Sequence, residues 1–491
     1  MSYIMAMDQG TSSSRAILFD AGGDLVALAQ REFDCLFPQE GWVEQDPEQL
    51  WQTSLSAARE VIEKSGIGAH EIAGLGITNQ RETTLVWDAE TSEPVYNAIV
   101  WQDRRTTEYC NTIRAEGMEA EISEITGLLI DPYFSSTKLA WILEHIPATR
   151  QQAEAGRLRF GTVDSFLIWR LTKGSCHATD ATNASRTQLF DINTQNWSEP
   201  LLSHFRIPQA LLPEVKDCVA DFGHCDAEWF GAEIPILSVV GDQQAALVGQ
   251  ACFHPGMTKS TYGTGCFVIS NTGEERIRSR NRLLSTVAYR LGGNTTYALE
   301  GSIFVAGVAM KWLRDRLHLI RHVQELEAAA EHCGPDTGGV YLVPAFTGLG
   351  APHWRPDARG LICGLGLDTT REQILTAALE SVGFQTLELL RAMAEDGAAV
   401  NALRVDGGMV VNNWLCQFLA DLLEVDVERP RIAETTAFGA ALLAGMGAGW
   451  FNGLDDMGRL WQGERTFHPA MQSGQRRQLL AGWQRAIDLL L

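Results

Sequence analysis

Small residues surround a carboxylate near the start of the chain, in the stretch Asp8-Gln9-Gly10-Thr11-Ser12-Ser13-Ser14-Arg15. The apolar run 3–7 precedes this stretch and the run 16–19 follows it, a pattern typical of two strands with a tight connection. Backbone amides at Gly10 and Thr11, with the hydroxyl groups beside them, can bind phosphate oxygens. Asp8 can hold the magnesium ion that accompanies such phosphates. A polar hairpin with a surface aspartate is the alternative interpretation.

A second carboxylate, Asp242, follows the predicted strand 234–240, and further glycine turns lie at 263–265 and 407–408. Three glycine turns spread over two halves of a chain can hold one triphosphate. Each turn alone is weak evidence, because glycine most often serves only to reverse the chain. Their combination with two carboxylates at strand ends favours nucleotide binding.

Two common nucleotide motifs are missing. The dipeptide Gly-Lys does not occur, which excludes a Walker A loop, and no complete GxGxxG follows a strand, which argues against a dinucleotide-binding fold. The net charge of −22 argues against binding to nucleic acid or to an anionic membrane.

The composition is that of a soluble globular protein, with 45% hydrophobic and 20% charged residues. The ten cysteines are scattered and form no CxxC pair, so we expect reduced thiols in the cytoplasm and no disulfide framework. No signal peptide is visible, because Asp8 interrupts the first apolar run. The uncharged run 435–454 is rich in Gly and Ala and predicts a packed helix and a turn, not a membrane span.

The elements that must position these residues are predicted from hydrophobic periodicity and caps. Asp46-Pro47 starts a helix that ends before Gly66, and 72–78 is a buried strand. Near residue 255 the chain begins again with strand, hydroxyl-rich turn and strand. The sequence therefore predicts a mixed α/β protein of two related halves, 1–250 and 251–491. Helices are expected from 101 onward, over 302–316 and over 368–390.

Further polar stretches lie at 79–84 (Asn-Gln-Arg-Glu-Thr-Thr), 101–106, 182–187, 241–247 and 262–267. A pattern of spaced residues runs from Gly360 through Gly364-Leu365 and ends at Ala377-Ala378-Leu379-Glu380. Together with 8–15, these stretches resemble the FGGY family of carbohydrate kinases, and within it the members that phosphorylate glycerol. The resemblance extends from about residue 3 to about residue 450.

The resemblance implies two α/β domains, actin-like and ribonuclease H-like, with a catalytic cleft between them. Domain 1–250 would carry the glycerol and phosphate-loop side, and domain 251–491 the nucleotide-binding side. The implied activity is transfer of the γ-phosphate of ATP to glycerol, giving sn-glycerol 3-phosphate and ADP, the first step of glycerol catabolism. The implied cofactors are ATP and Mg²⁺, and the family expectation is a cytoplasmic homodimer or homotetramer.

The resemblance also assigns roles to residues. Asp242 would be the general base, Asp8 would bind magnesium, and Arg15 would stabilise the migrating charge. The expected glycerol contacts are Arg81, Glu82, Trp101, Tyr133, Asp242, Gln243 and Phe267. The expected nucleotide and phosphate contacts are Thr11, Ser12, Ser13, Arg15, Thr264, Gly265, Gly307, Lys311, Gly408 and Asn412. Arg81 and Glu82 supply a donor and an acceptor, and both reach one ligand only where a strand ends.

Three departures from the family pattern affect these expectations. Lys311 stands where these kinases usually carry Gln, and it either strengthens ATP binding or extends into solvent. Glu233 lies where some bacterial members bind an anionic sugar bisphosphate, so we predict no inhibition of that kind. The tail from Gly463 shows no match, so the resemblance gives no basis for regulation by a partner protein through it. A kinase for another polyol or ketose, and an actin-like ATPase that transfers no phosphate to a polyol, are the alternatives.

Overall fold

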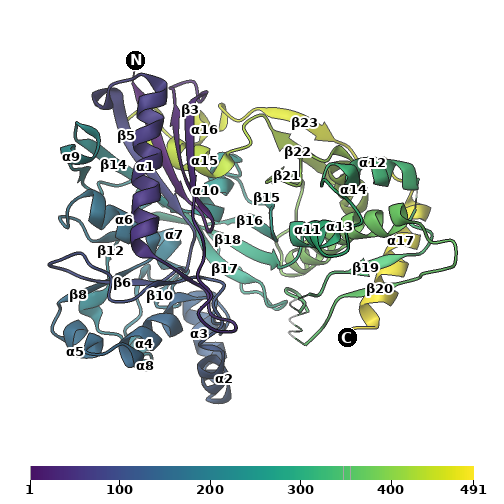
Figure 1. Ribbon diagram of the computed structural model, residues 1–491, viewed down its shortest axis with the longest axis horizontal. Coiled ribbons are helices and arrows are strands. Elements are labelled where there is room, and N and C mark those ends of the chain that lie inside the picture. The colour runs from purple at the N-terminus through teal and green to yellow at the C-terminus, as the bar shows by residue number, and fades with distance from the viewer. Residues whose placement is uncertain (1, 335, 347, 354, 356) are drawn as a thin grey trace. The chain divides into compact units, whose positions relative to one another are not determined.

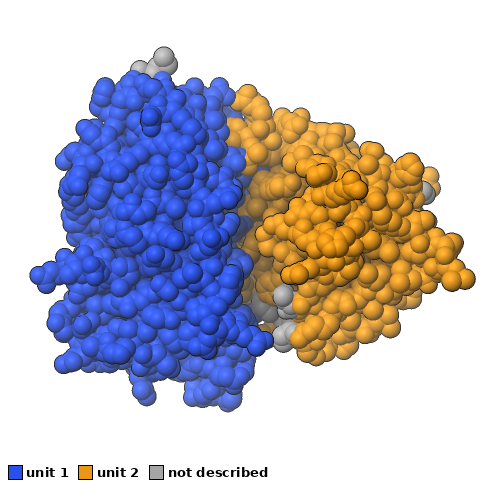
Figure 2. All heavy atoms as spheres, in the orientation of Figure 1, with its two compact units in different colours: residues 1–253, 285–297, 434–461 blue, residues 254–284, 298–433, 462–491 orange. Residues whose placement is uncertain are grey.

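The computed structural model describes residues 2–334, 336–346, 348–353, 355 and 357–491 (Figure 1). The chain forms two compact units (Figure 2). Unit 1 comprises residues 1–253, 285–297 and 434–461, and unit 2 comprises 254–284, 298–433 and 462–491. The halves predicted from the sequence were contiguous, 1–250 and 251–491. The structure differs because the two insertions 285–297 and 434–461 pack with the N-terminal part of the chain.

The main sheet of unit 1 has the strand order β13-β14-β5-β1-β2-β3. Its strands are β1 (Tyr3–Gln9), β2 (Ser13–Phe19), β3 (Leu25–Glu32), β5 (Ile72–Asn79), β13 (His224–Cys225) and β14 (Ile234–Gly241). The strands β1, β5 and β14 are parallel, whereas β2 is antiparallel to both β1 and β3. Parallel strands place their carboxyl ends at one edge of a sheet. The ends of β1, β5 and β14 therefore meet, and the predicted polar residues follow directly from them.

Helices cover both faces of this sheet. Helix α1 (Pro47–Ser65) packs its apolar stripe with the sheet residues Leu75, Ile77 and Val239 in one core. The residue before Val239 on β14 points the other way, because side chains of a strand alternate between faces. Ser238 there donates a hydrogen bond to the carbonyl of Ala440 on α15 (Thr435–Gly447). Helix α15 is thus the helix expected in 435–454, and it lies on the face opposite α1.

The remaining elements of unit 1 surround this sheet. Its other strands are β4 (Glu44–Gln45), β6 (Leu85–Asp88), β7 (Ala98–Ile99), β8 (Leu158–Gly161), β9 (Ala178–Asp180), β10 (Phe190–Asp191), β11 (Asn196–Trp197), β12 (Glu214–Lys216) and β17 (Leu284–Leu291). Its other α-helices are α2 (Thr107–Ala115), α3 (Glu119–Thr126), α4 (Ser135–His145), α5 (Thr149–Glu154), α6 (Val163–Leu171), α7 (Ala181–Ala184), α8 (Glu199–His204), α9 (Ala227–Phe230), α10 (Asp242–Gly249) and α16 (Leu454–Gly458). Short 3₁₀ turns, η1 (Ala69–Glu71) and η2 (Gln209–Leu211), complete it.

Unit 2 repeats the strand order of unit 1. The seven-stranded sheet runs β17-β18-β16-β15-β21-β22-β23, with β15 antiparallel to β16 and parallel to β21, and its last six strands match the unit 1 sheet in reverse order. The strands of unit 2 are β15 (Met257–Tyr262), β16 (Cys266–Gly273), β18 (Asn294–Ile303), β19 (Tyr341–Val343), β20 (Leu361–Cys363), β21 (Ala402–Asp406), β22 (Asp426–Pro430) and β23 (Gly463–Phe467). The expected repeat and the actin-like, ribonuclease H-like fold class are confirmed.

The helices of unit 2 are α11 (Gly307–Asp315), α12 (Glu325–Cys333), α13 (Arg371–Glu395), α14 (Asn413–Leu423) and α17 (Ser473–Asp488). The helix predicted over 302–316 begins only at Gly307, because Ser302 still belongs to β18. Helix α13 starts three residues later than predicted, at a capping box formed by Thr370 and Gln373.

The helix expected from residue 101 was also placed too early, because 101–106 form turns and α2 begins at Thr107. The caps of α1 are as predicted: Asp46 accepts a hydrogen bond from the amide of Glu48, and Gly66 is left-handed with φ 70°. Within the described part of the chain, no helix combines the length and the apolar character that a membrane crossing requires.

Candidate active site

The turn between β1 and β2 is tight and partly open to solvent. The amide of Gly10 donates to the carbonyl of Ser13 at 2.9 Å, so three residues connect the strands. Asp8 lies beside this turn, directly across the β1–β2 ladder from Arg15, and it is 8% exposed. The arrangement agrees with the predicted hairpin, and it brings one carboxylate, one guanidinium and the hydroxyl groups of the turn together.

Asp8 shares its surroundings with two other charged groups of unit 1. Arg15 Nη1 is 3.8 Å from Asp8 Oδ2 and 3.0 Å from Glu434 Oε2. Burial raises the pKa of Asp8 to about 7; Arg15 opposes the shift, and the carboxylates of Asp242 and Glu434 add to it. A nearby cation would favour the ionised form of Asp8. Because Arg15 already pairs with two carboxylates, its guanidinium is held in place by them.

Arg81 and Glu82 follow the end of β5 in an unusual backbone conformation. The amide of Thr83 donates to the carbonyl of Arg81 at 2.7 Å, which closes a three-residue turn around Glu82. Glu82 itself has φ 60°, a region that few residues other than glycine occupy. Such strain is found mainly at functional sites, where the surroundings hold it in place. In a strand, neighbouring side chains point to opposite faces. The turn ends this alternation, so the side chains of Arg81 and Glu82 can serve one site.

Arg81 connects Glu82 to Asp242. Its Nε lies 3.2 Å from Asp242 Oδ1 and 4.0 Å from Glu82 Oε1. The side chain of Arg81 is 2% exposed, whereas that of Asp242 is 29% exposed. Asp242 therefore presents a solvent-accessible carboxylate that is anchored from behind by a buried guanidinium.

The position of Asp242 is set by two glycines in a close helix crossing, Gly249 on its own helix and Gly439 far away in sequence. Asp242 is the first residue of α10, and this helix crosses α15 where Gly249 and Gly439 lie together. A Cβ on Gly439 would come within 1.9 Å of the carbonyl oxygen of Ala245. Only glycine permits this close helix crossing, which places the first turn of α10 at the end of β14.

Buried cations surround Glu82. Arg186 Nε donates to Glu82 Oε1 at 2.6 Å, and both side chains are at most 2% exposed. Lys138 donates through Nζ to the carbonyl of Tyr133 at 2.5 Å. Burial lowers the pKa of Lys138 to about 8, although Glu82 favours its charged form. The carboxylate of Glu82 is thus held in one orientation among donors.

Two aromatic residues of the expected glycerol site lie against each other. The rings of Trp101 and Tyr133 form a T-shaped pair with centroids 5.6 Å apart. The indole Nε1 of Trp101 donates to the hydroxyl of Thr11 at 2.9 Å. Trp101 therefore connects the expected glycerol residues of unit 1 to the β1–β2 turn (residues 10–12), which is the expected phosphate loop.

The expected nucleotide residues of unit 2 lie on adjoining loops. The amides of Gly307 and Val308, at the start of α11, donate to the carbonyls of Gly263 and Thr264 at 3.0 and 3.1 Å. The amide of Met409, next to Gly408, donates to the carbonyl of Tyr262 at 3.2 Å. A glycine turn, a helix start and a second glycine turn are thus joined by backbone hydrogen bonds.

Other predicted residues have clear positions but no tested role. Lys311 is exposed on α11, and Phe267 is half-buried on β16. The side-chain oxygen of Asn412 accepts from the amide of Leu415, so Asn412 caps α14. The backbone amide of Gln243 donates to Asp242 Oδ1 at 2.6 Å. The roles assigned to these residues remain predictions.

Sequence reasoning missed several residues that the structure places at the site. Arg186, Gln80 and Gln244 occur within the quoted motifs, so their types and positions were a usable signal. Glu434 gave no signal, because it is 419 residues from its partner Arg15.

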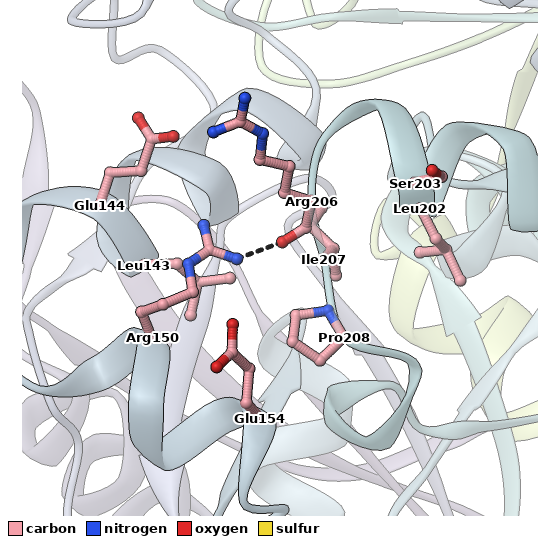
Figure 3. A pocket seen from close by; sticks show the side chains of 9 residues that line it. All are labelled: Leu143, Glu144, Arg150, Glu154, Leu202, Ser203, Arg206, Ile207 and Pro208. Carbon is pink, nitrogen blue, oxygen red and sulfur yellow. Dashed lines mark hydrogen bonds between the residues drawn. The ribbon is translucent and has the colours of Figure 1, made fainter.

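A separate hollow lies on unit 1, away from these residues (Figure 3). It is lined by Leu143, Glu144, Arg150, Glu154, Leu202, Ser203, Arg206, Ile207 and Pro208, none of which was predicted to bind substrate. The guanidinium of Arg150 donates to the carbonyl of Arg206, as the dashed line shows. Two arginines and two glutamates line the hollow together, so it presents no single sign of charge to a ligand.

Comparison with known proteins adds independent evidence. The N-terminal domain model of the FGGY family of carbohydrate kinases matches residues 3–249, and its C-terminal domain model matches 258–448. The chain is 59% identical over 485 residues to glycerol kinase 1 of Pseudomonas aeruginosa, covering 99% of this chain and 98% of that protein. It is 57% identical over 486 residues to the glycerol kinase of Marinomonas sp., with the same coverage.

Solved structures agree with these matches. The crystal structure of Plasmodium falciparum glycerol kinase with ADP superimposes with a TM-score of 0.94 at 36% identity, covering 100% of this chain and 98% of that chain. Ligand-bound xylulose kinase from Lactobacillus acidophilus has a TM-score of 0.90 at 19% identity, with coverage of 100% and 98%, and shares the fold alone.

Proposed function

Because the chain belongs to the FGGY family of carbohydrate kinases, we propose that it transfers the γ-phosphate of ATP to glycerol. The products are sn-glycerol 3-phosphate and ADP. The observation that carries the proposal is the placement of Asp242 beside Arg81 and Glu82 at the end of parallel strands. Identity of 55–60% over essentially the whole chain to proteins named glycerol kinase supports the same substrate.

The polar groups of unit 1 suit a small polyol. Each hydroxyl of glycerol can donate one hydrogen bond and accept others, so its site needs both kinds of partner. Arg81 offers donors, Glu82 and Asp242 offer acceptors, and the Trp101–Tyr133 pair offers an apolar surface for the carbon chain. Gln243 adds an amide. We propose that these residues bind glycerol, and that Phe267 of unit 2 adds a further apolar contact.

Asp242 is the proposed general base. It is the most exposed carboxylate of this group, so it can accept the proton of the attacking hydroxyl. Phosphoryl transfer passes through a loose transition state, in which alignment of the attacking oxygen matters more than strong basicity. The buried Arg81 holds Asp242 in one direction and so supplies that alignment.

Asp8 and the β1–β2 turn suit a magnesium-bound phosphate. No cluster of three or more His, Cys, Asp or Glu able to hold a metal ion occurs among the described residues. Mg²⁺ commonly uses one or two carboxylates and completes its octahedron with phosphate oxygens and water. Asp8 fits that donor set, and the ion would neutralise charge on the phosphates. We assign Thr11, Ser12 and Ser13 to phosphate contacts, and Arg15 to holding Asp8.

The loops of unit 2 are the proposed nucleotide contacts. Thr264, Gly265, Gly307 and Gly408 lie on backbone segments joined by hydrogen bonds, so the segments keep a common geometry. Small residues there allow close approach of a ligand to the backbone. The ADP in the P. falciparum structure supports ATP as phosphate donor. Asn412 and Lys311 complete the proposed set.

One substrate panel tests the function. We expect ADP release with ATP and glycerol to be far faster than with erythritol, with xylulose or without acceptor. Equal release without acceptor would favour an actin-like ATPase, and faster release with another polyol or ketose would favour a different specificity.

Asp242→Asn is expected to lower kcat by about 10²–10⁴-fold, the range for a general base. Retention of the full rate by this variant would remove the assignment of the base.

We further propose that the enzyme acts in the cytoplasm as a homodimer or homotetramer. None of the ten cysteines lies in a disulfide, which suits a reducing compartment. Light scattering of the purified protein would give the oligomeric state. A monomer at working concentrations would contradict this part of the proposal.

A further inference from the structure

Three buried amide side chains lie together behind the phosphate loop of unit 1. Gln9, Gln45 and Gln80 are each at most 1% exposed. Nε2 of Gln80 lies 3.0 Å from Oε1 of Gln9, 2.9 Å from Oε1 of Gln45 and 3.2 Å from the carbonyl of Gly10. On its other side, Oε1 of Gln80 accepts from the hydroxyl of Thr83 at 2.9 Å. Both ends of the Gln80 amide are therefore engaged.

The cluster holds the carbonyl groups of the phosphate loop. Gln9 Nε2 donates to the carbonyl of Gly10 at 2.8 Å, and Gln45 Nε2 donates to the carbonyl of Thr11 at 2.7 Å. A trans peptide is planar and its C=O and N–H point in opposite directions. Holding these two carbonyls inward turns the amides of Thr11 and Ser12 outward. That is the orientation in which they can bind a phosphate oxygen.

The same cluster contacts the glycerol residues. Gln80 directly precedes Arg81 and Glu82, and its own amide donates to the carbonyl of Gln9 at 2.7 Å. The hydroxyl of Thr83, which donates to Gln80, accepts from the backbone amide of Trp101 at 3.3 Å. A continuous series of hydrogen bonds thus runs from the phosphate loop through Gln80 and Thr83 to Trp101. The chain itself joins Gln80 to Arg81 and Glu82.

We propose that Gln80 is a positioning residue that couples the phosphate loop to the glycerol-binding segment. It fixes the distance between the amides that hold the transferred phosphate and the residues that hold the acceptor hydroxyl. The consequence is that phosphate passes to glycerol and not to water. This inference rests on the proposed function, because it requires glycerol as acceptor. Gln80 is not itself a proposed contact of glycerol or of the phosphate. It acts through the two backbone segments that carry those contacts.

The test replaces Gln80 by methionine, which keeps the length of the side chain and removes its hydrogen bonds. The matched control is Gln188→Met. Gln188 is equally buried in unit 1, accepts from the hydroxyl of Ser136 at 2.6 Å and donates to the carbonyl of Leu129 at 2.6 Å. Gln45→Met is a second test variant, which removes the hydrogen bond to Thr11 and leaves the contact between Gln80 and Thr83.

For each full-length variant, ADP and glycerol 3-phosphate are measured in the same reaction, together with kcat and the KM for glycerol. For Gln80→Met we expect kcat to fall between about tenfold and a hundredfold, as for a small misplacement of reacting groups. The KM for glycerol should stay close to that of the parent. The ratio of ADP to glycerol 3-phosphate should rise clearly above one. Gln45→Met should change in the same direction, and Gln188→Met should lower only the Tm.

A ratio of one in both Gln80→Met and Gln45→Met would overturn the coupling role. So would a kcat that falls no further in Gln80→Met than in Gln188→Met at a similar loss of Tm. If Gln80→Met fails to fold, the Gln45→Met result decides. The parent chain is assayed first. If it forms no glycerol 3-phosphate, the proposed function itself fails, which is a different outcome from an unchanged ratio.

Discussion

The guanidinium of Arg186 lies 2.6 Å from the carboxylate of Glu82, and neither side chain reaches solvent. Glu82 adopts a left-handed conformation, so its side chain is directed by this ion pair as well as by its backbone. An uncompensated buried charge costs about 3–5 kcal/mol when its partner is removed. Removing Arg186 alone would therefore destabilise unit 1, and the pair orients a proposed glycerol acceptor.

Arg186→Met is expected to lower the Tm and to raise the KM for glycerol, because Glu82 loses the partner that directs it. The double variant Arg186→Met/Glu82→Gln should recover part of the Tm, since no buried charge is left unpaired, but it should not recover glycerol affinity. Thermal unfolding and steady-state kinetics measure the two effects. Recovery of both together would show that Glu82 does not bind glycerol.

Gln244 supports Arg81 in a similar way. Its Oε1 accepts from Arg81 Nη1 at 3.1 Å, and its Nε2 donates to the carbonyl of Val287 at 3.1 Å. A hydrogen bond to a charged group contributes about 1.5–3 kcal/mol. We expect Gln244→Met to lower kcat/KM for glycerol by about tenfold or more. Gln244→Glu keeps an acceptor for Arg81 and should lose less; an equal loss in both variants would contradict this role.

Glu380, in the last part of the family motif, predicts a dependence of stability on pH. Burial on α13 raises its pKa to about 8, and the nearby carboxylate of Asp336 adds to the shift. Glu380 in turn contributes to the raised pKa values of Cys333 and Tyr341. The folded chain binds this proton and the unfolded chain loses it near its ordinary pKa of 4.5. Stability from this group is therefore complete below pH 4.5 and is lost as the pH rises to about 8.

The variant Glu380→Gln removes this titration. We expect the free energy of unfolding of the parent, relative to the variant, to fall by about 4 kcal/mol between pH 4.5 and 8. Thermal unfolding of both proteins across this range is the measurement. Glu395→Gln, an exposed position on the same helix, is the control and should follow the parent. A constant difference between Glu380→Gln and the parent would show that Glu380 is ionised in the folded chain.

Lys311 offers a test of the nucleotide side. It is exposed on α11, the helix that starts at Gly307. If its charge acts on ATP phosphates, Lys311→Gln raises the KM for ATP about two- to fivefold, an effect that shrinks at higher salt because an exposed charge is screened. Arg316→Gln, at the exposed end of the same helix, is the control. An unchanged KM for ATP would show that Lys311 extends into solvent.

Inhibition by an anionic sugar bisphosphate is expected to be absent. Glu233 is exposed and follows the short helix α9, which ends at the left-handed Gly231. A carboxylate there repels an anionic effector. Rates measured with and without a sugar bisphosphate, at matched ionic strength, should agree. Saturable inhibition would show that another surface binds such an effector.

The sequence by itself determined the local elements and the types of residue available for chemistry. The hairpin at Asp8, the capped helix α1 and the strand that ends before Asp242 depend on neighbouring residues, so periodicity and caps predict them. The repeat of strand, turn and strand after residue 255 likewise predicted two related halves. The apolar run 72–78 predicted a strand that ends just before Arg81 and Glu82, and at a strand end adjacent side chains can serve one ligand.

Only the tertiary structure decided which distant groups meet. Arg15 pairs with Glu434, and α10 crosses α15 at Gly249 and Gly439, because residues 434–461 return to unit 1. The left-handed turn at Glu82 persists because Arg186 and the surrounding core hold it, and no local propensity favours it. These features depend on contacts between segments that lie 104 to 419 residues apart. A pattern read along the chain contains the residue types but not their partners.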